Sequence, residues 1–86
     1  MPPAATATTR EIHDELGRPW RALAVDAVVA HGRPGALLAF LPVDQPEAPP
    51  LATNVTFNSH RAAALALRTM GDKELVRRLT LAVASS

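Results

Sequence analysis

The last third of the chain constrains the fold most, because within residues 53–82 the apolar pattern changes from a strand period to a helix period. Val55 and Phe57 alternate with Thr56 and Asn58, which predicts a short strand near 53–58 with Val55 and Phe57 on its buried face. Ser59 is a favourable N-cap for a helix that begins directly after it. A strand that leads into a capped helix indicates a fold of the α+β class.

Two helical patterns follow this cap, and a glycine separates them. The first covers residues 60–70, and Gly71 ends it. Asp72 caps the second, which continues to about residue 83. Each pattern has one apolar stripe, so we expect two C-terminal helices packed on one face of a sheet.

Residues 20–31 fit both a strand and a helix. A helix over 19–31 would begin at Pro19 and end before a glycine, and it leads to the alternative of a mostly helical domain. The strand is favoured by the next twelve residues, which contain a Pro-Gly turn at 32–35 and the apolar run 36–43. We therefore expect a β-hairpin of 20–31 and 36–43.

The strand interpretation divides the first arm of this hairpin into two faces. One face carries Leu23, Val25, Ala27 and Val29, and the other carries Ala22, Ala24, Asp26, Val28 and Ala30. A lone acidic residue on a strand is most often exposed, so we expect Asp26 to face solvent.

The N-terminal segment has weaker signals. Residues 1–8 have no periodicity and predict a disordered leader, followed by a single small domain over 9–84. Thr8 and Glu11 have the spacing of a capping box, and Gly17 is a natural terminator. These residues predict a short N-terminal helix.

Composition excludes several classes of function. The 86 residues include no cysteine, so neither disulfides nor cysteine zinc sites are available. The three histidines lack metal-ligand spacing, and we predict no catalytic, metal-binding or cofactor-binding residue. There is no secretory signal and no run of roughly eighteen apolar residues. We therefore expect a cytoplasmic, non-enzymatic protein with no membrane partner and no cofactor.

One group of side chains remains as a candidate interaction surface. Residues 53–86 contain five of the nine basic residues, and the only tryptophan lies at the start of the predicted hairpin. Tryptophan and arginine are enriched where proteins bind each other. The candidate residues are Trp20, Arg61, Arg68, Lys73, Arg77 and Arg78.

These features favour a small accessory module that acts by binding itself, as a homodimer, or another protein. The apolar hairpin would have exposed edges, which promote association. The alternative is nucleic-acid binding through the basic face of the two C-terminal helices.

Overall fold

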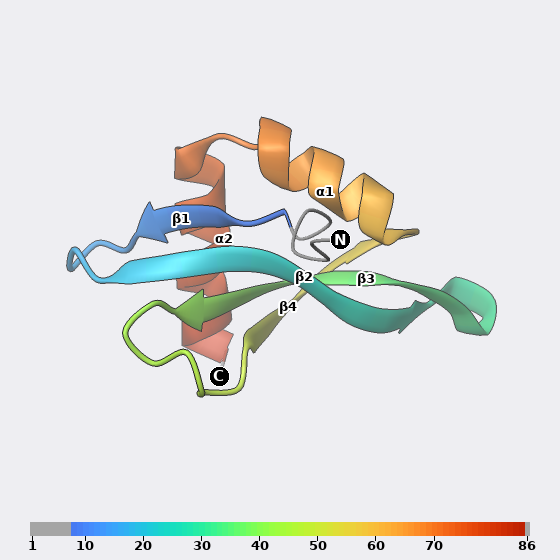
Figure 1. Cartoon of the computed structure of the whole chain (residues 1–86), viewed down its shortest axis with the longest axis horizontal. Helices are drawn as coiled ribbons and strands as arrows, with labels where there is room; N and C mark the ends of the chain where they lie inside the picture. The colour runs from blue at the N-terminus through green and yellow to red at the C-terminus, as the bar shows by residue number, and fades with distance from the viewer. Residues whose placement is uncertain (1–7, 86) are drawn as a thin grey trace, which may run out of the picture.

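Residues 8–85, which the computed structural model describes, form four strands and two helices (Figure 1). Each strand pairs antiparallel with its neighbour in the sequence, giving the order β1-β2-β3-β4. The bounds are β1 Arg10–His13, β2 Pro19–Val29, β3 Arg33–Pro42, β4 Leu51–Phe57, α1 His60–Thr69 and α2 Asp72–Ser85. The predicted α+β class is confirmed. The leader predicted for residues 1–8 lies outside the described residues, apart from Thr8.

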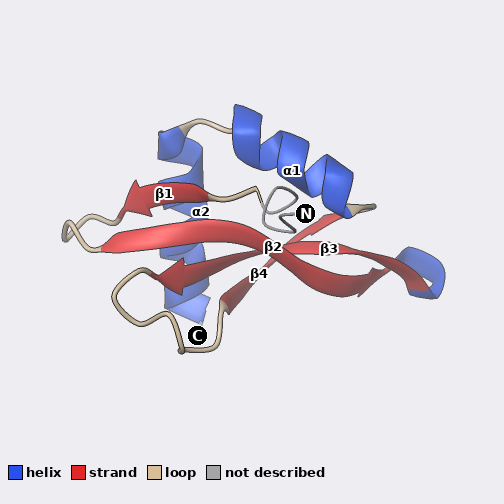
Figure 2. Cartoon of the chain, viewed as in Figure 1, coloured by secondary structure: helices blue, strands red, loops and turns tan. Residues whose placement is uncertain are grey.

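Both helices cover the same face of the sheet, the inner face (Figure 2). The strand register places Ile12 opposite Trp20, and Ala22 opposite Phe40, so all four side chains point to this face. Alanines on β2 leave room for α1 to approach closely. The core contains Ile12, Trp20, Ala22, Leu38, Phe40, Leu67, Leu75 and Leu79.

β2 and β3 form the predicted hairpin, which excludes a helix over 19–31. Its turn differs from the prediction at 32–35, because Val29 already pairs with Arg33. The connection Ala30–Gly32 is a 3-10 turn in which His31 has a φ of 62° and Gly32 a φ of 71°. These left-handed conformations reverse the chain two to three residues earlier than expected.

Pro34 belongs to β3 rather than to a turn. It lies opposite Val28, beyond the end of β4, which pairs with β3 only as far as Ala36. β3 therefore has one neighbour at Pro34 instead of two, and proline is tolerated at such edge positions. The Pro-Gly pair was a misleading turn signal for this reason.

The short N-terminal helix predicted from the sequence is wrong. Residues 10–13 form β1, which pairs with the start of β2. As a strand, this segment places Ile12 opposite Trp20. The Ile12 side chain is then only 3% exposed. Asp14 then begins a turn in which Gly17 has a φ of 84°. Burial of Ile12 in the sheet outweighs a capping signal at the chain surface.

The two predicted C-terminal helices are present, but Met70 is the C-cap of the first, and Asp72 is the first helical residue of the second rather than its cap, because the Leu75 amide donates to the Gly71 carbonyl oxygen at 3.1 Å. The Ser59 side chain accepts a hydrogen bond from the Ala62 amide at 3.1 Å, as an N-cap does. The second helix begins at Asp72, directly after Gly71. The strand predicted at 53–58 is also present and starts two residues earlier, at Leu51.

Candidate interaction surface

Trp20 is part of the core rather than of an exposed surface. Its side chain faces the helices and is only 7% exposed. The indole Nε1 donates a hydrogen bond to Asp14 Oδ2 at 3.0 Å, and the Arg18 guanidinium lies 5.1 Å from the centre of the ring. The tryptophan therefore closes one end of the core, with its polar atom satisfied by the neighbouring loop.

Asp14 organises this end of the molecule, a role that the sequence did not predict. Its Oδ1 accepts hydrogen bonds from the amides of Leu16 and Arg18, both at 2.9 Å. The bond from Trp20, followed by the bond from the Arg18 amide, lowers the pKa of the Asp14 carboxyl below its ordinary value. The Arg18 guanidinium also reaches Asp44 at 3.2 Å. These contacts stabilise a loop and assign it no chemistry.

Arg10 is a second residue that the sequence did not reveal. Its guanidinium donates to the carbonyl oxygens of Leu67 and Met70, at 2.9 and 2.8 Å, and pairs with Asp72. Leu67 lies in the last turn of α1 and Met70 is its C-cap residue, where backbone acceptors lack helical partners. Arg10 therefore connects β1 to the junction between the two helices. Only the fold brings these residues, far apart in the sequence, together.

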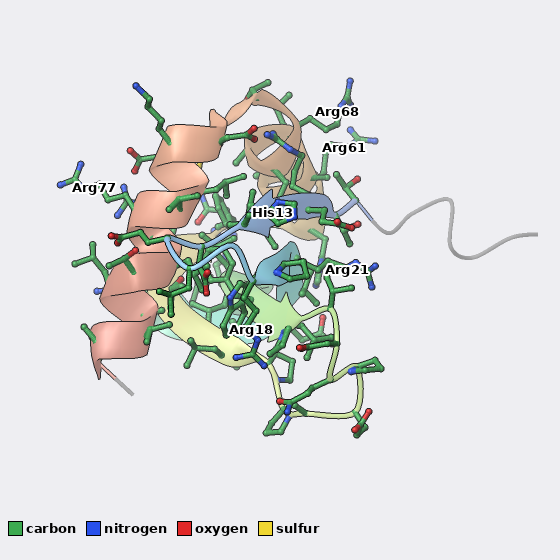
Figure 3. The ribbon with its side chains drawn as sticks, turned by 90° about the vertical axis from the view of Figure 1, so that its left-hand side faces the viewer. His13, Arg18, Arg21, Arg61, Arg68 and Arg77 are labelled. Atoms are coloured by element: carbon green, nitrogen blue, oxygen red, sulfur yellow. The ribbon has the colours of Figure 1, made fainter. Side chains whose placement is uncertain are left out.

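The basic residues of the two helices do not gather on one face. Figure 3 shows Arg61 and Arg68 of α1 on one side of the molecule and Arg77 of α2 on the opposite side. Arg78 is bonded to Glu74 at 2.7 Å. All five are exposed or partly exposed: Arg61, Arg68, Lys73, Arg77 and Arg78. The structure therefore separates the α1 pair from the α2 residues.

The titratable residues do not assemble a metal site in the part of the chain that is described. Across residues 8–85 there is no group of three or more His, Cys, Asp or Glu side chains placed to hold an ion. His60 lies 2.6 Å from Asp26, whose side chain is 98% exposed, as predicted. This pair joins the start of α1 to the hairpin at the surface.

The most unusual surface is the face of the sheet that the helices leave uncovered, the outer face. The register pairs Leu23 with Ala39, and Val25 with Leu37, on this face. Leu23, Val25 and Leu37 lie outside the core cluster and are partly exposed, whereas Ala39 is fully buried. The outer-face residues of the two long strands are Pro19, Arg21, Leu23, Val25, Ala27, Val29, Arg33, Gly35, Leu37, Ala39 and Leu41.

This composition departs from the usual alternation. An antiparallel sheet covered on one side normally presents polar side chains on the other. Here leucine and valine occupy the centre of the free side and are partly exposed. Charged residues lie toward its ends, with Arg21 opposite Glu11 at one end and Arg33 near the hairpin turn at the other. The sequence showed how the side chains of β2 alternate between two faces. It did not show which of the two faces the helices would cover.

Comparison with known proteins gives no match: no family model, curated protein or solved structure is similar to this chain. Among the helices of residues 8–85, none is long and apolar enough to cross a membrane. The outer face is therefore interpreted from its own geometry.

Proposed function

We propose that this protein is a non-enzymatic interaction module that self-associates, with the outer face of its sheet packed on the same face of a second copy. The observation that carries the proposal is the apolar centre of that face, formed by the partly exposed side chains of Leu23, Val25 and Leu37. Contiguous exposed apolar surface on a small domain commonly marks a protein contact. Action in the cytoplasm stays a prediction.

The dimensions of the outer face suit a dimer. At about 3.3 Å per residue and about 4.8 Å between strands, the four strands present a face of roughly 500 Å² in projection. A stable interface buries about 800 Å² of accessible surface on each partner, and accessible surface exceeds projected area. Two such faces would pack about 10 Å apart, as the sheets of a β-sandwich do.

A second copy is the partner that these features favour. In a two-fold dimer one patch meets itself, so an apolar patch finds an apolar partner without any other protein. The few charged residues of the outer face, Arg21, Arg33 and Glu11, lie toward its ends. The centre therefore has no charge to desolvate, as the core of an interface requires.

A matched pair of variants tests the proposal by sedimentation equilibrium. Val25→Glu places a charge at the centre of the outer face, whereas Val28→Glu places it three residues along the same strand on the other side. Val28 is 77% exposed, so its replacement is a control for an added charge on β2. We expect the wild type and Val28→Glu to associate at micromolar concentration through the outer face, and Val25→Glu to lose that contact. Equal association of the two variants would contradict the proposal.

Nucleic-acid binding remains the alternative function. Because the basic residues of the two helices lie apart, the candidate binding surface is now limited to the arginines of α1. Arg61 and Arg68 lie two turns apart, and neither forms an ion pair with another described residue. If these arginines contact phosphates, the affinity for duplex DNA should fall steeply as the salt concentration rises. It should also fall when both arginines are changed to glutamate. Fluorescence anisotropy with a labelled DNA duplex measures this affinity. Absence of binding at low salt would exclude nucleic-acid binding as the function.

A further inference from the structure

The strand β2 is covered along only part of its edge. β1 pairs with β2 over residues 19–22, whereas β2 continues to Val29. Among the described strands, residues 23–29 therefore have a neighbour on one side only, which is β3. Their register with β3 runs without a shift to Val29 opposite Arg33, so the free edge is regular. It contains no proline and a single charged residue, Asp26, and edges of this kind accept a further strand.

The helix α1 lies beside this free edge and runs along it (Figure 1). Its first residue, His60, lies with Nε2 2.6 Å from Asp26 Oδ1. Near the other end of the helix, the Leu67 carbonyl oxygen accepts a hydrogen bond from Arg10, which is opposite Ala22 of β2. α1 is therefore antiparallel to β2 where the free edge begins.

A groove separates the free edge from α1. Its walls include residues 23–24 of β2, Ala64 of α1 and, at one end, residues 8–9. Its volume is about 130 Å³, which is less than the roughly 300 Å³ of the smallest pockets that hold small molecules. A strand added to β2 would place every second side chain on the side of α1. The groove therefore suits one small side chain of an extended peptide.

Two arginines flank Ala64 on the same side of α1. Arg61 precedes Ala64 by three residues and Arg68 follows it by four, which is the spacing of a single helical stripe. Both arginines are exposed, and neither forms an ion pair with another described residue. Figure 3 shows both on one side of the molecule. The small centre of the groove therefore has a free positive charge on either side.

We propose that this groove binds an acidic peptide segment of a partner protein, which pairs with the free edge of β2 as a further strand. In this mode of recognition the backbone supplies affinity and the side chains supply specificity. Arg61 and Arg68 are separated by about 10 Å along the helix axis. Two carboxylates four residues apart in a strand are separated by about 13 Å, a difference that flexible arginine side chains can span. The favoured sequence therefore has two acidic residues with a small residue midway between them.

The free edge favours a peptide over a nucleic acid as the occupant. Phosphates would pair with the arginines of α1 but would leave the backbone groups of β2 without a matching strand. The contact lies in the plane of the sheet, whereas the outer face points away from it. The peptide site therefore does not depend on the proposed self-association.

Fluorescence anisotropy with a labelled peptide tests this site in the full chain. The probe is Val-Glu-Thr-Ala-Thr-Glu-Val, in which the glutamates and the central alanine lie on one side of an extended chain. Changing both Arg61 and Arg68 to glutamate should weaken binding at least about tenfold, because two charge-assisted contacts are lost. Changing both Lys73 and Arg77 of α2 to glutamate is the control and should leave the affinity within about twofold, because distant charges are screened.

The groove and the strand pairing have separate measurements. Ala64→Phe should fill the groove and abolish binding, whereas Ala62→Phe, exposed on another side of α1, should bind as the wild type does. Two further peptides are methylated on alternate backbone amides, one on the odd and one on the even positions. Only every second amide of an added strand faces β2, so one of these peptides should lose binding and the other should keep it.

The proposal is refuted if the full chain does not bind the peptide. It is also refuted if Ala64→Phe and Ala62→Phe, both folded by circular dichroism, bind it equally, or if the two methylated peptides do. Binding that appears only after deletion of residues 1–7 would mean that the chain's own N-terminus takes the place of a partner. Binding of a DNA duplex instead of the peptide would assign Arg61 and Arg68 to the alternative function.

Discussion

The two faces of this sheet share the same strands and differ in what covers them. On β3, Leu38 points to the helices and is fully buried, whereas its neighbour Leu37 points to the outer face and is partly exposed. Both faces are apolar, although only one has a partner within the described residues. An apolar strand face therefore predicts that something will cover it. Whether the helices of the same chain cover it depends on the rest of the fold.

The largest expected effect comes from the two leucines. In the Val25→Glu background, Leu38→Ala removes core side chain and should lower the free energy of unfolding by about 3–5 kcal/mol. Leu37→Ala should lower it by only about 1 kcal/mol, because its side chain is already partly in water. Urea titrations of both variants provide the measurement. Similar losses would mean that the outer face is packed within a single copy.

Gly35 tests whether every outer-face position tolerates change. A Cβ atom at Gly35 would lie 2.5 Å from the Phe57 carbonyl oxygen and 2.7 Å from Val29 Cγ1. Gly35→Ala should therefore cost roughly 1–3 kcal/mol, since a backbone atom has to move. Gly71→Ala is the control, because nothing lies within 4 Å of its Cβ position. Thermal unfolding that ranks the two variants equally would contradict this geometry.

The smallest effect concerns the end of the inner face, where Asp14 holds Trp20. Its folded pKa lies below the ordinary value of 3.8, so the stability that it contributes is complete at neutral pH. That contribution is lost as the pH falls below about 4, through the folded pKa. Asp14→Asn should unfold at lower urea than the wild type at neutral pH, and the difference should narrow in acid. Glu47→Gln, at an exposed position outside this turn, is the control and should unfold at the same urea concentration as the wild type at neutral pH.

Local patterns predicted most of the elements, because periodicity and caps are local. Ser59 predicted the start of α1, and the alternation at Val55 and Phe57 predicted β4. The helix predicted for the N-terminal segment was wrong, because the structure of this segment depends on strand pairing that places Ile12 opposite Trp20. The hairpin turn shifted because the register of β2 and β3, rather than the Pro-Gly pair, decides where the chain reverses.

The candidate surface was harder to predict than the elements. Composition identified Arg61 and Arg77, but their opposite placement depends on the angle between the helices (Figure 3). Trp20 was a reasonable surface candidate from the sequence, but in the structure β1 and the Asp14 turn cover its side chain. The outer face could not be predicted, because its exposure depends on which side of β2 both helices occupy.

The most direct test of the central claim is the solvent access of methyl groups on the two faces, measured by NMR with a soluble paramagnetic probe. As the concentration of wild-type protein is raised, the Val25 and Leu37 methyl groups should become protected. Leu38 should be protected throughout, and Leu65, 58% exposed on α1, should remain accessible. If the accessibility of the Val25 and Leu37 methyl groups does not change with concentration, no second copy covers the outer face.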